Sequence, residues 1–99
     1  MRARYVLTPE AQAHIDEIGA YIEGDNVDAA LKVYDALEEA FGLLAERPGL
    51  GHSREDLTDR PLRFWSVFSY LVVYDPESRP LTIVAVLHGA RDVEKLLKR

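Results

Sequence analysis

Two consecutive segments in the first half of the chain repeat hydrophobic residues at helical spacing. The first carries the apolar stripe Ala11, Ile15, Ile18 and Ile22. Intervals of four, three and four residues put these side chains on one face of a helix. Thr8 and Pro9 mark its start, because a threonine hydroxyl caps free backbone N–H groups and proline suits the first helical position. Glu10 favours the positive end of the helix dipole, and Gly24 is the expected cap at the other end.

The second segment carries the stripe Ala30, Tyr34, Leu37, Phe41 and Leu44. Its intervals alternate between four and three residues, which suits two helices packed along their length. Asp25 or Asn26 is the expected cap at its start, and Pro48 ends it. Since only a few residues separate the two helices, we expect them to form an antiparallel hairpin.

The second half of the chain has the patterns of β-strands. Residues 62–67 alternate in part, residues 70–74 are continuously apolar, and residues 81–87 are rich in β-branched side chains. A continuous apolar run is typical of a central strand that is covered on both faces. The turn residues 75–80 are expected to join the last two runs as an antiparallel hairpin.

A short β-prone run at Tyr5–Leu7 completes the pattern. The order of elements predicts an α+β fold: an N-terminal strand, a helical hairpin and a three-stranded antiparallel segment, with the helices on one face of a mostly antiparallel sheet. Residues 90–98 could add a short terminal helix. We expect the arginine-bearing surface on the other face of the sheet or at its C-terminal end.

The composition restricts the chemistry of the chain. Its 99 residues are 47% hydrophobic and fit one domain, residues 1–99. The absence of Cys excludes disulfides, thiolate metal sites and a Cys nucleophile. His14 and His52 lack a carboxylate at ligand spacing, so we expect them at the surface or in loops, with no metal and no cofactor. No apolar run approaches the roughly 18 residues of a membrane span, and we expect a cytoplasmic protein.

The net charge of −5 is unevenly distributed. Residues 1–53 hold four Lys or Arg and ten Asp or Glu, a net charge of −6, whereas residues 54–99 hold eight and seven, a net charge of +1. The acidic residues of the helical hairpin are therefore expected to form a solvated face. Because nucleic-acid binding relies on Lys and Arg that neutralise phosphates, we expect no direct DNA binding by this chain alone.

Four stretches form an ordered set along the chain. They are Tyr5–Ala11, Ile18 with Tyr21 and Ile22, the loop Pro48–Leu57 with the pattern Pro-x-x-Gly-x-x-Arg-x-Asp-Leu, and the pair 70–74 and 86–92. In this order they resemble the RelE/ParE superfamily of bacterial toxins from type II toxin–antitoxin modules, and most closely its ParE branch. The resemblance implies a growth-inhibiting protein that a co-expressed antitoxin neutralises in a hetero-oligomer.

The resemblance leaves two activities open. ParE-like members are described as poisons of DNA gyrase, and RelE-like members as ribosome-dependent messenger-RNA endonucleases. RNA cleavage without a metal needs a base, an acid and cations at the phosphate, for which His88, Arg63 and Arg91 are the candidates. Residues 70–74 and 81–87 contain no Lys or Arg. We therefore expect gyrase binding without catalysis, with a non-toxic interaction module of the same fold as a third hypothesis.

The predicted target- or partner-binding residues are Arg54, Arg63, Trp65 and Arg91. For Arg54 we favour an ion pair with Asp56 that orders the loop, because arginine and carboxylate side chains pair by forked hydrogen bonds. Two arrangements remain open for the neighbouring aromatic residues Phe64, Trp65 and Phe68. Either an antitoxin segment covers them, or they pack under the loop 48–61.

Overall fold

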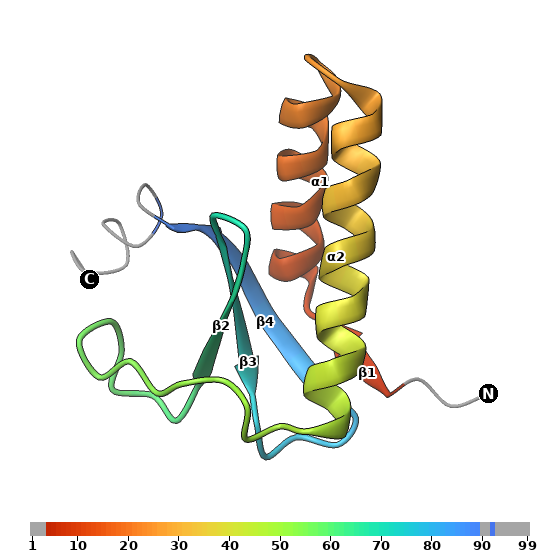
Figure 1. The fold of residues 1–99 in the computed structure, drawn as a ribbon. Helices are drawn as coiled ribbons and strands as arrows, with labels where there is room; N and C mark the ends of the chain where they lie inside the picture. The colour runs from red at the N-terminus through yellow and green to blue at the C-terminus, as the bar shows by residue number, and fades with distance from the viewer. Residues whose placement is uncertain (1–3, 90–91, 93–99) are drawn as a thin grey trace.

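The computed structural model describes residues 4–89 and Asp92 (Figure 1). Its elements are β1 (Tyr5–Leu7), α1 (Pro9–Glu23), α2 (Val27–Glu46), β2 (Arg63–Val67), β3 (Tyr70–Asp75) and β4 (Leu81–His88). The predicted α+β class and the order of its elements are confirmed. The terminal helix predicted over residues 90–98 lies almost wholly outside the described residues. None of the described helices is long and apolar enough to cross a membrane.

Both helices begin at the predicted caps. The Thr8 hydroxyl accepts a hydrogen bond from the N–H of Ala11 at 3.1 Å, and the Asn26 side chain accepts one from the N–H of Ala29 at 3.0 Å. Asn26 and not Asp25 is therefore the cap of α2. Gly24 ends α1 as expected, although its backbone stays right-handed. Each helix buries residues of its predicted stripe, with Ala11, Ile15, Ala30, Leu37, Phe41 and Leu44 in the core.

The four strands form one sheet in the order β1-β4-β3-β2. β2, β3 and β4 are antiparallel neighbours, as predicted. β1 pairs in parallel with β4, with Tyr5 opposite Leu81. The helical hairpin leads from β1 to β2 at the opposite edge of the sheet, so the connection between the parallel neighbours β1 and β4 runs through α1, α2, β2 and β3. β3 lies inside the sheet and buries Val72, Val73 and Tyr74 in succession, which confirms the central strand.

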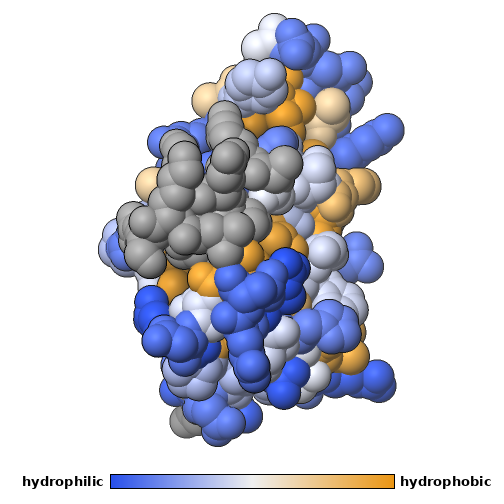
Figure 2. Space-filling model, turned by 90° about the vertical axis from the view of Figure 1, so that its left-hand side faces the viewer, coloured by the Kyte–Doolittle hydropathy of each residue, from blue (hydrophilic) through white to orange (hydrophobic). Residues whose placement is uncertain are grey.

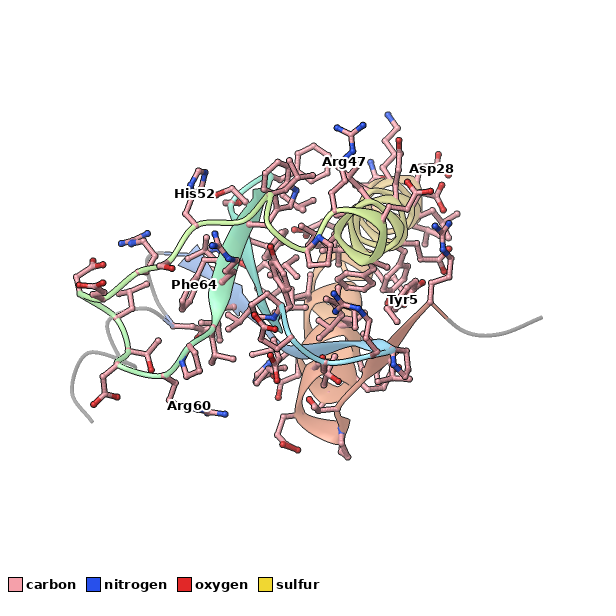
Figure 3. All side chains as sticks on the ribbon, turned by 90° about the horizontal axis from the view of Figure 1, so that it is seen from below. Tyr5, Asp28, Arg47, His52, Arg60 and Phe64 are labelled. Atoms are coloured by element: carbon pink, nitrogen blue, oxygen red, sulfur yellow. The ribbon has the colours of Figure 1, made fainter. Side chains whose placement is uncertain are left out.

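The two faces of the sheet pack against different partners. The helices cover one face, with Val72, Tyr74, Ile83 and Val86 in that core. On the open face, Phe64 and Val73 pack with Leu57 and Leu62 from the loop before β2. Figure 2 views this side of the molecule, and Figure 3 shows Phe64 with the loop residues His52 and Arg60 around it.

The aromatic residues of the second half therefore have separate positions. Phe64 is 3% exposed and packs under the loop, which is one of the two arrangements left open. Trp65 points to the opposite face and packs, partly buried, against the helix-side core. Phe68 is 69% exposed in the turn after β2, where its φ is 54°. The strand residues in the cluster on the open face are apolar, and Arg60 lies in the loop near Phe64 (Figure 3).

The side chains of Thr8, the N-cap of α1, and of His14 in α1 form hydrogen bonds with the backbone of β4 beyond the end of β1. β1 covers Leu81 to Ile83 only. Further along, the Thr8 hydroxyl donates to the carbonyl of Val84 at 2.9 Å, and the N–H of Val86 donates to Nδ1 of His14 at 3.2 Å. The prediction of a surface or loop position is thus wrong for His14, which lies between α1 and the sheet and satisfies a backbone donor.

Gly19 allows the two helices to approach closely. A Cβ at this buried position would overlap the ring and hydroxyl of Tyr34. We expect Gly19→Ala to destabilise the protein by about 1–3 kcal/mol, because the overlap outweighs the higher helix propensity of alanine. Gly42→Ala is the matched control in α2, where a Cβ meets nothing within 4 Å. It should be neutral or stabilising by up to about 1 kcal/mol. Urea unfolding measures both, and equal effects would contradict this packing.

Candidate functional site

The ribonuclease candidates lie at opposite ends of the sheet. His88 is paired with Tyr70, and Arg63 is paired with Tyr74. Four residues along β3 correspond to about 13 Å, because a strand rises by about 3.4 Å per residue. Arg91 lies outside the described residues. The described structure therefore does not assemble His88 and Arg63 into one cluster.

The Arg63 side chain binds the loop that precedes β2. Its Nη1 donates to the carbonyl of Gly51 at 2.5 Å. Beside it, the Tyr74 hydroxyl accepts from the N–H of Gly51 at 2.8 Å and donates to the carbonyl of Pro48 at 2.6 Å. Burial raises the pKa of Tyr74 above its ordinary value of 10.0, against the opposing effects of the Gly51 hydrogen bond and the Arg63 charge. Tyr74 thus anchors the loop to β3. The sequence does not indicate this role, because Tyr74 ends a continuous apolar run.

Arg54 and Asp56 form the ion pair favoured from the sequence. Nε and Nη2 of Arg54 donate to the two carboxylate oxygens at 3.0 and 2.9 Å. The hydrogen bond from Arg54 lowers the pKa of Asp56 and raises that of Arg54. The side chains stay 41% and 61% accessible, so the pair orders the loop while presenting both charges to solvent. A role of Arg54 in target binding stays a prediction.

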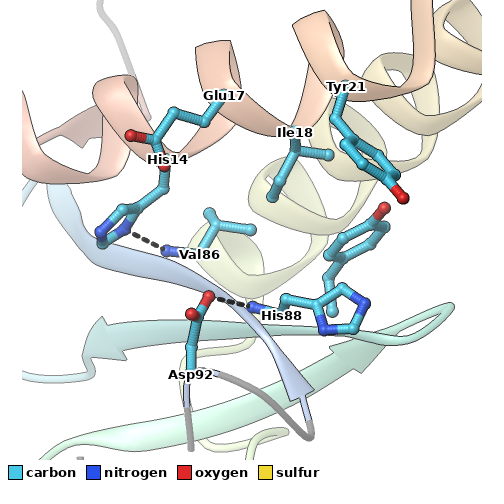
Figure 4. Close-up of a pocket in the computed structure, with 8 residues that line it drawn as sticks. His14, Glu17, Ile18, Tyr21, Val86, His88 and Asp92 are labelled. Atoms are coloured by element: carbon cyan, nitrogen blue, oxygen red, sulfur yellow. Dashed lines mark hydrogen bonds between the residues drawn. The ribbon is translucent and has the colours of Figure 1, made fainter. Parts of the chain in front are cut away.

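A cavity of about 350 Å³ lies between α1 and the ends of β3 and β4 (Figure 4). The strand register places Tyr70 next to His88, with their ring centroids 5.7 Å apart in an edge-on arrangement. No tyrosine is next to His88 in the sequence, so its proximity to the Tyr70 phenol becomes visible only when the strands are paired. Among the residues that the structure describes, no Lys or Arg lines the cavity. The described lining therefore supplies no cation for the phosphate of a ribonuclease substrate, and Arg91 lies outside the described residues.

A second hollow, here called the acidic groove, runs between β1, α1 and α2 and has a volume of about 410 Å³. Its floor is apolar and contains Leu7, Ile15, Leu37 and the Tyr5–Phe41 ring pair, whose centroids are 5.3 Å apart. Its described rim carries Asp16, Asp35 and Glu38 and no Lys or Arg. Burial, with a contribution from the negative charge of Glu38, raises the pKa of Tyr5.

The acidic groove has two features of a docking site. Leu31 on its α2 wall is 53% exposed. β1 beside it is an edge strand of the sheet, with one side unpaired in the described structure. Exposed apolar side chains and an open strand edge are the elements that peptide segments use for binding. The signal in the sequence was Leu31, which is apolar and lies outside the buried stripe of α2.

Comparison with known proteins defines the class. Residues 5–93 match the family model of the ParE toxin of the type II toxin–antitoxin system parDE. The chain is 34% identical over 96 residues to "Putative toxin Y4kP" of Sinorhizobium fredii, covering 97% of this chain and 98% of that protein. It is 32% identical over 100 residues to Toxin ParE1 of Mycobacterium tuberculosis, covering 98% of this chain and the whole of that protein.

The fold agrees with a solved structure described as the chromosomal ParDE TA system from P. aeruginosa. The TM-score is 0.67 at 18% identity, over 85% of this chain and 92% of that chain. This likeness shows the fold, whereas the family model and the relatives at 34% and 32% identity define the class, toxins of type II toxin–antitoxin systems. Within that class the chain belongs to the ParE family, as its resemblance to the ParE branch predicted.

Proposed function

We propose that this toxin inhibits growth in the cytoplasm by binding DNA gyrase, without catalysing a reaction. The observation that carries the proposal is the separation of His88 from Arg63 along β3. A metal-free ribonuclease would need them together with a phosphate-binding cation. Membership of the ParE family favours the same choice over the RelE-type endonuclease and over a non-toxic module.

We propose further that a cognate antitoxin neutralises the toxin by occupying the acidic groove. The apolar floor suits the hydrophobic face of an amphipathic segment, and the three rim carboxylates suit Lys or Arg beside that face. Antitoxin segments of this kind fold as they bind, so the groove selects a partner by the spacing of its apolar and basic residues. The resulting assembly is a hetero-oligomer of toxin and antitoxin.

For the target surface we propose the loop before β2, with Arg54 as its contact residue. Its guanidinium is 41% accessible although it is paired with Asp56. Arg63 and Trp65 support this surface indirectly, since Arg63 holds Gly51 and Trp65 packs into the helix-side core. Arg91 remains a proposed contact from the segment beyond β4.

A supercoiling assay with purified gyrase tests the target. We expect the toxin to inhibit supercoiling and to accumulate cleavage complexes. Arg54→Ala should raise the inhibitory concentration about tenfold, the loss expected for one well-placed arginine at an interface. Arg79→Ala, in the exposed turn before β4, should change it less than about twofold. Intact gyrase activity together with new messenger-RNA ends in induced cells would instead establish the ribonuclease.

A further inference from the structure

The face of the sheet turned away from the helices carries an apolar strip, here called the open-face strip. It comprises Leu71 on β3 and Val84, Ala85 and Leu87 on β4, all partly buried and packed against the core cluster of this face. Leu71 lies directly opposite Leu87 in the antiparallel ladder. Neither α1 nor α2 contributes a side chain to this cluster. Figure 2 shows hydrophobic side chains among the polar ones on this side of the molecule.

The loop before β2 covers a different part of the same face. Its Leu57 and Leu62 pack with Phe64 and Val73, whose exposed fractions are only 3% and 4%. The open-face strip extends from there toward the end of β4 and remains only partly buried. Because covering apolar side chains is favourable, the strip is a docking surface.

The chain leaves β4 beside the open-face strip. The N–H of Gly89 donates to the carbonyl of Ser69 at 2.9 Å, and the N–H of His88 donates to Oδ2 of Asp92 at 2.7 Å. Gly89 and Asp92 are helical. These bonds hold the exit of the chain at the ends of β3 and β4, so the residues after Asp92 start next to Leu87.

Residues 93–99, which lie outside the described residues, have the sequence pattern of an amphipathic helix. Val93, Leu96 and Leu97 stand at positions i, i+3 and i+4, which puts them on one helical face. Lys95 and Lys98 fall on the other side of the same helix. Seven helical residues extend about 10 Å, and neighbouring strands lie about 4.8 Å apart. Such a helix matches the width of the sheet from β4 to β2.

We propose that residues 93–99 of this chain dock on the open-face strip, with Val93, Leu96 and Leu97 against Leu71 and Leu87. The segment is tethered beside the strip, which gives it an effective concentration on the order of millimolar. A second copy of the chain or a partner protein has to displace it to bind the same strip. The proposal does not depend on which target the toxin inhibits.

Methyl NOEs measured in the full chain test the contact. We expect NOEs from the methyl groups of Leu96 and Leu97 to those of Leu71 and Leu87. No NOE is expected to Leu31, which lines the acidic groove. In a sample that mixes isotope-labelled and unlabelled chains, an isotope-filtered spectrum should show none of these NOEs, because both groups belong to one chain.

A pair of substitutions in the full chain separates apolar docking from helix propensity. Leu97→Ser should lower the melting temperature by roughly 5–10 °C, because it removes a buried apolar side chain. Lys95→Ser loses similar helix propensity on the opposite helical face and should change the melting temperature by less than about 2 °C. Leu97→Ser should also shift the resonances of Leu71 and Leu87, while those of Leu37 in the helix-side core stay in place.

Four results would overturn the proposal. Absence of NOEs between residues 93–99 and the open-face strip would show that the segment does not dock. NOEs in the isotope-filtered spectrum would assign the strip to a second copy of the chain. A strip that lacks these NOEs in the free toxin but contacts the antitoxin in the complex would belong to that partner. Equal melting shifts for Leu97→Ser and Lys95→Ser would exclude a buried apolar face on the segment.

Discussion

A toxin in which Asp16, Asp35 and Glu38 are replaced by lysine is expected to escape its antitoxin while keeping its fold and its toxicity. These carboxylates form the rim of the acidic groove, and all three residues are exposed. Exposed substitutions of this kind each change stability by about 0.5 kcal/mol or less. Like charges facing a basic antitoxin segment cost several kcal/mol, so the affinity should fall by at least about a hundredfold.

The measurement is calorimetry with the purified antitoxin, beside growth of cells that express both proteins. The matched control replaces Glu23, Asp25 and Glu39 by lysine, which makes the same change in net charge at exposed residues outside the groove. The control should remain neutralised, with an affinity within about threefold of the native toxin at physiological salt. If both triple variants lose affinity equally, the antitoxin responds to net charge and the groove is not its binding site.

Tyr74→Phe is expected to destabilise the protein by about 2–3 kcal/mol. The substitution keeps the buried ring but removes two hydrogen bonds, leaving the N–H of Gly51 and the carbonyl of Pro48 without this partner. A lost buried hydrogen bond costs about 1–1.5 kcal/mol, and for a domain of this size the melting temperature should fall by roughly 10–20 °C. Thermal and urea unfolding at pH 7 measure the change, and a loss below about 0.5 kcal/mol would contradict the anchor.

The same variant should change the stability at alkaline pH. Burial raises the pKa of folded Tyr74 above the unfolded value of 10.0, so the unfolded chain releases this proton first. The stability contributed by Tyr74 is therefore complete below pH 10 and is lost as the pH rises through the folded pKa. Tyr74→Phe should show a shallower alkaline decline. Burial also raises the pKa of Tyr5. Tyr5→Phe should therefore also make the alkaline decline shallower, without the large loss of stability at pH 7 that is expected for Tyr74→Phe.

Local chemistry made the helices predictable. Thr8 caps α1 because its hydroxyl reaches an N–H three residues away, and Asn26 caps α2 in the same way. Likewise, the turn at residues 75–80 joins neighbouring strands in the only direction that a short connection allows. Each of these features depends on residues that are close together in the chain, so it can be predicted from the local sequence pattern.

The candidate sites could not be predicted in the same way. The carboxylates of the acidic groove look like a solvated face in the sequence, and the groove appears only when β1 lies beside both helices. His14 looks like a surface residue until α1 packs over the outer edge of β4. His88 looks isolated until the register brings Tyr70 to its side. Each contact joins residues that are distant in sequence, and local spacing says nothing about them.

The sequence alone determined the α+β class, the two capped helices, the central strand and the resemblance to ParE toxins. These depend on periodicity, turn residues and ordered motifs, which act over short distances along the chain. Only the tertiary structure decided that β1 pairs in parallel with β4, that Arg63 holds the loop and lies far from His88, and where the groove and the cavity form. The physical reason is that packing and strand register select among contacts that the chain brings together only when it folds.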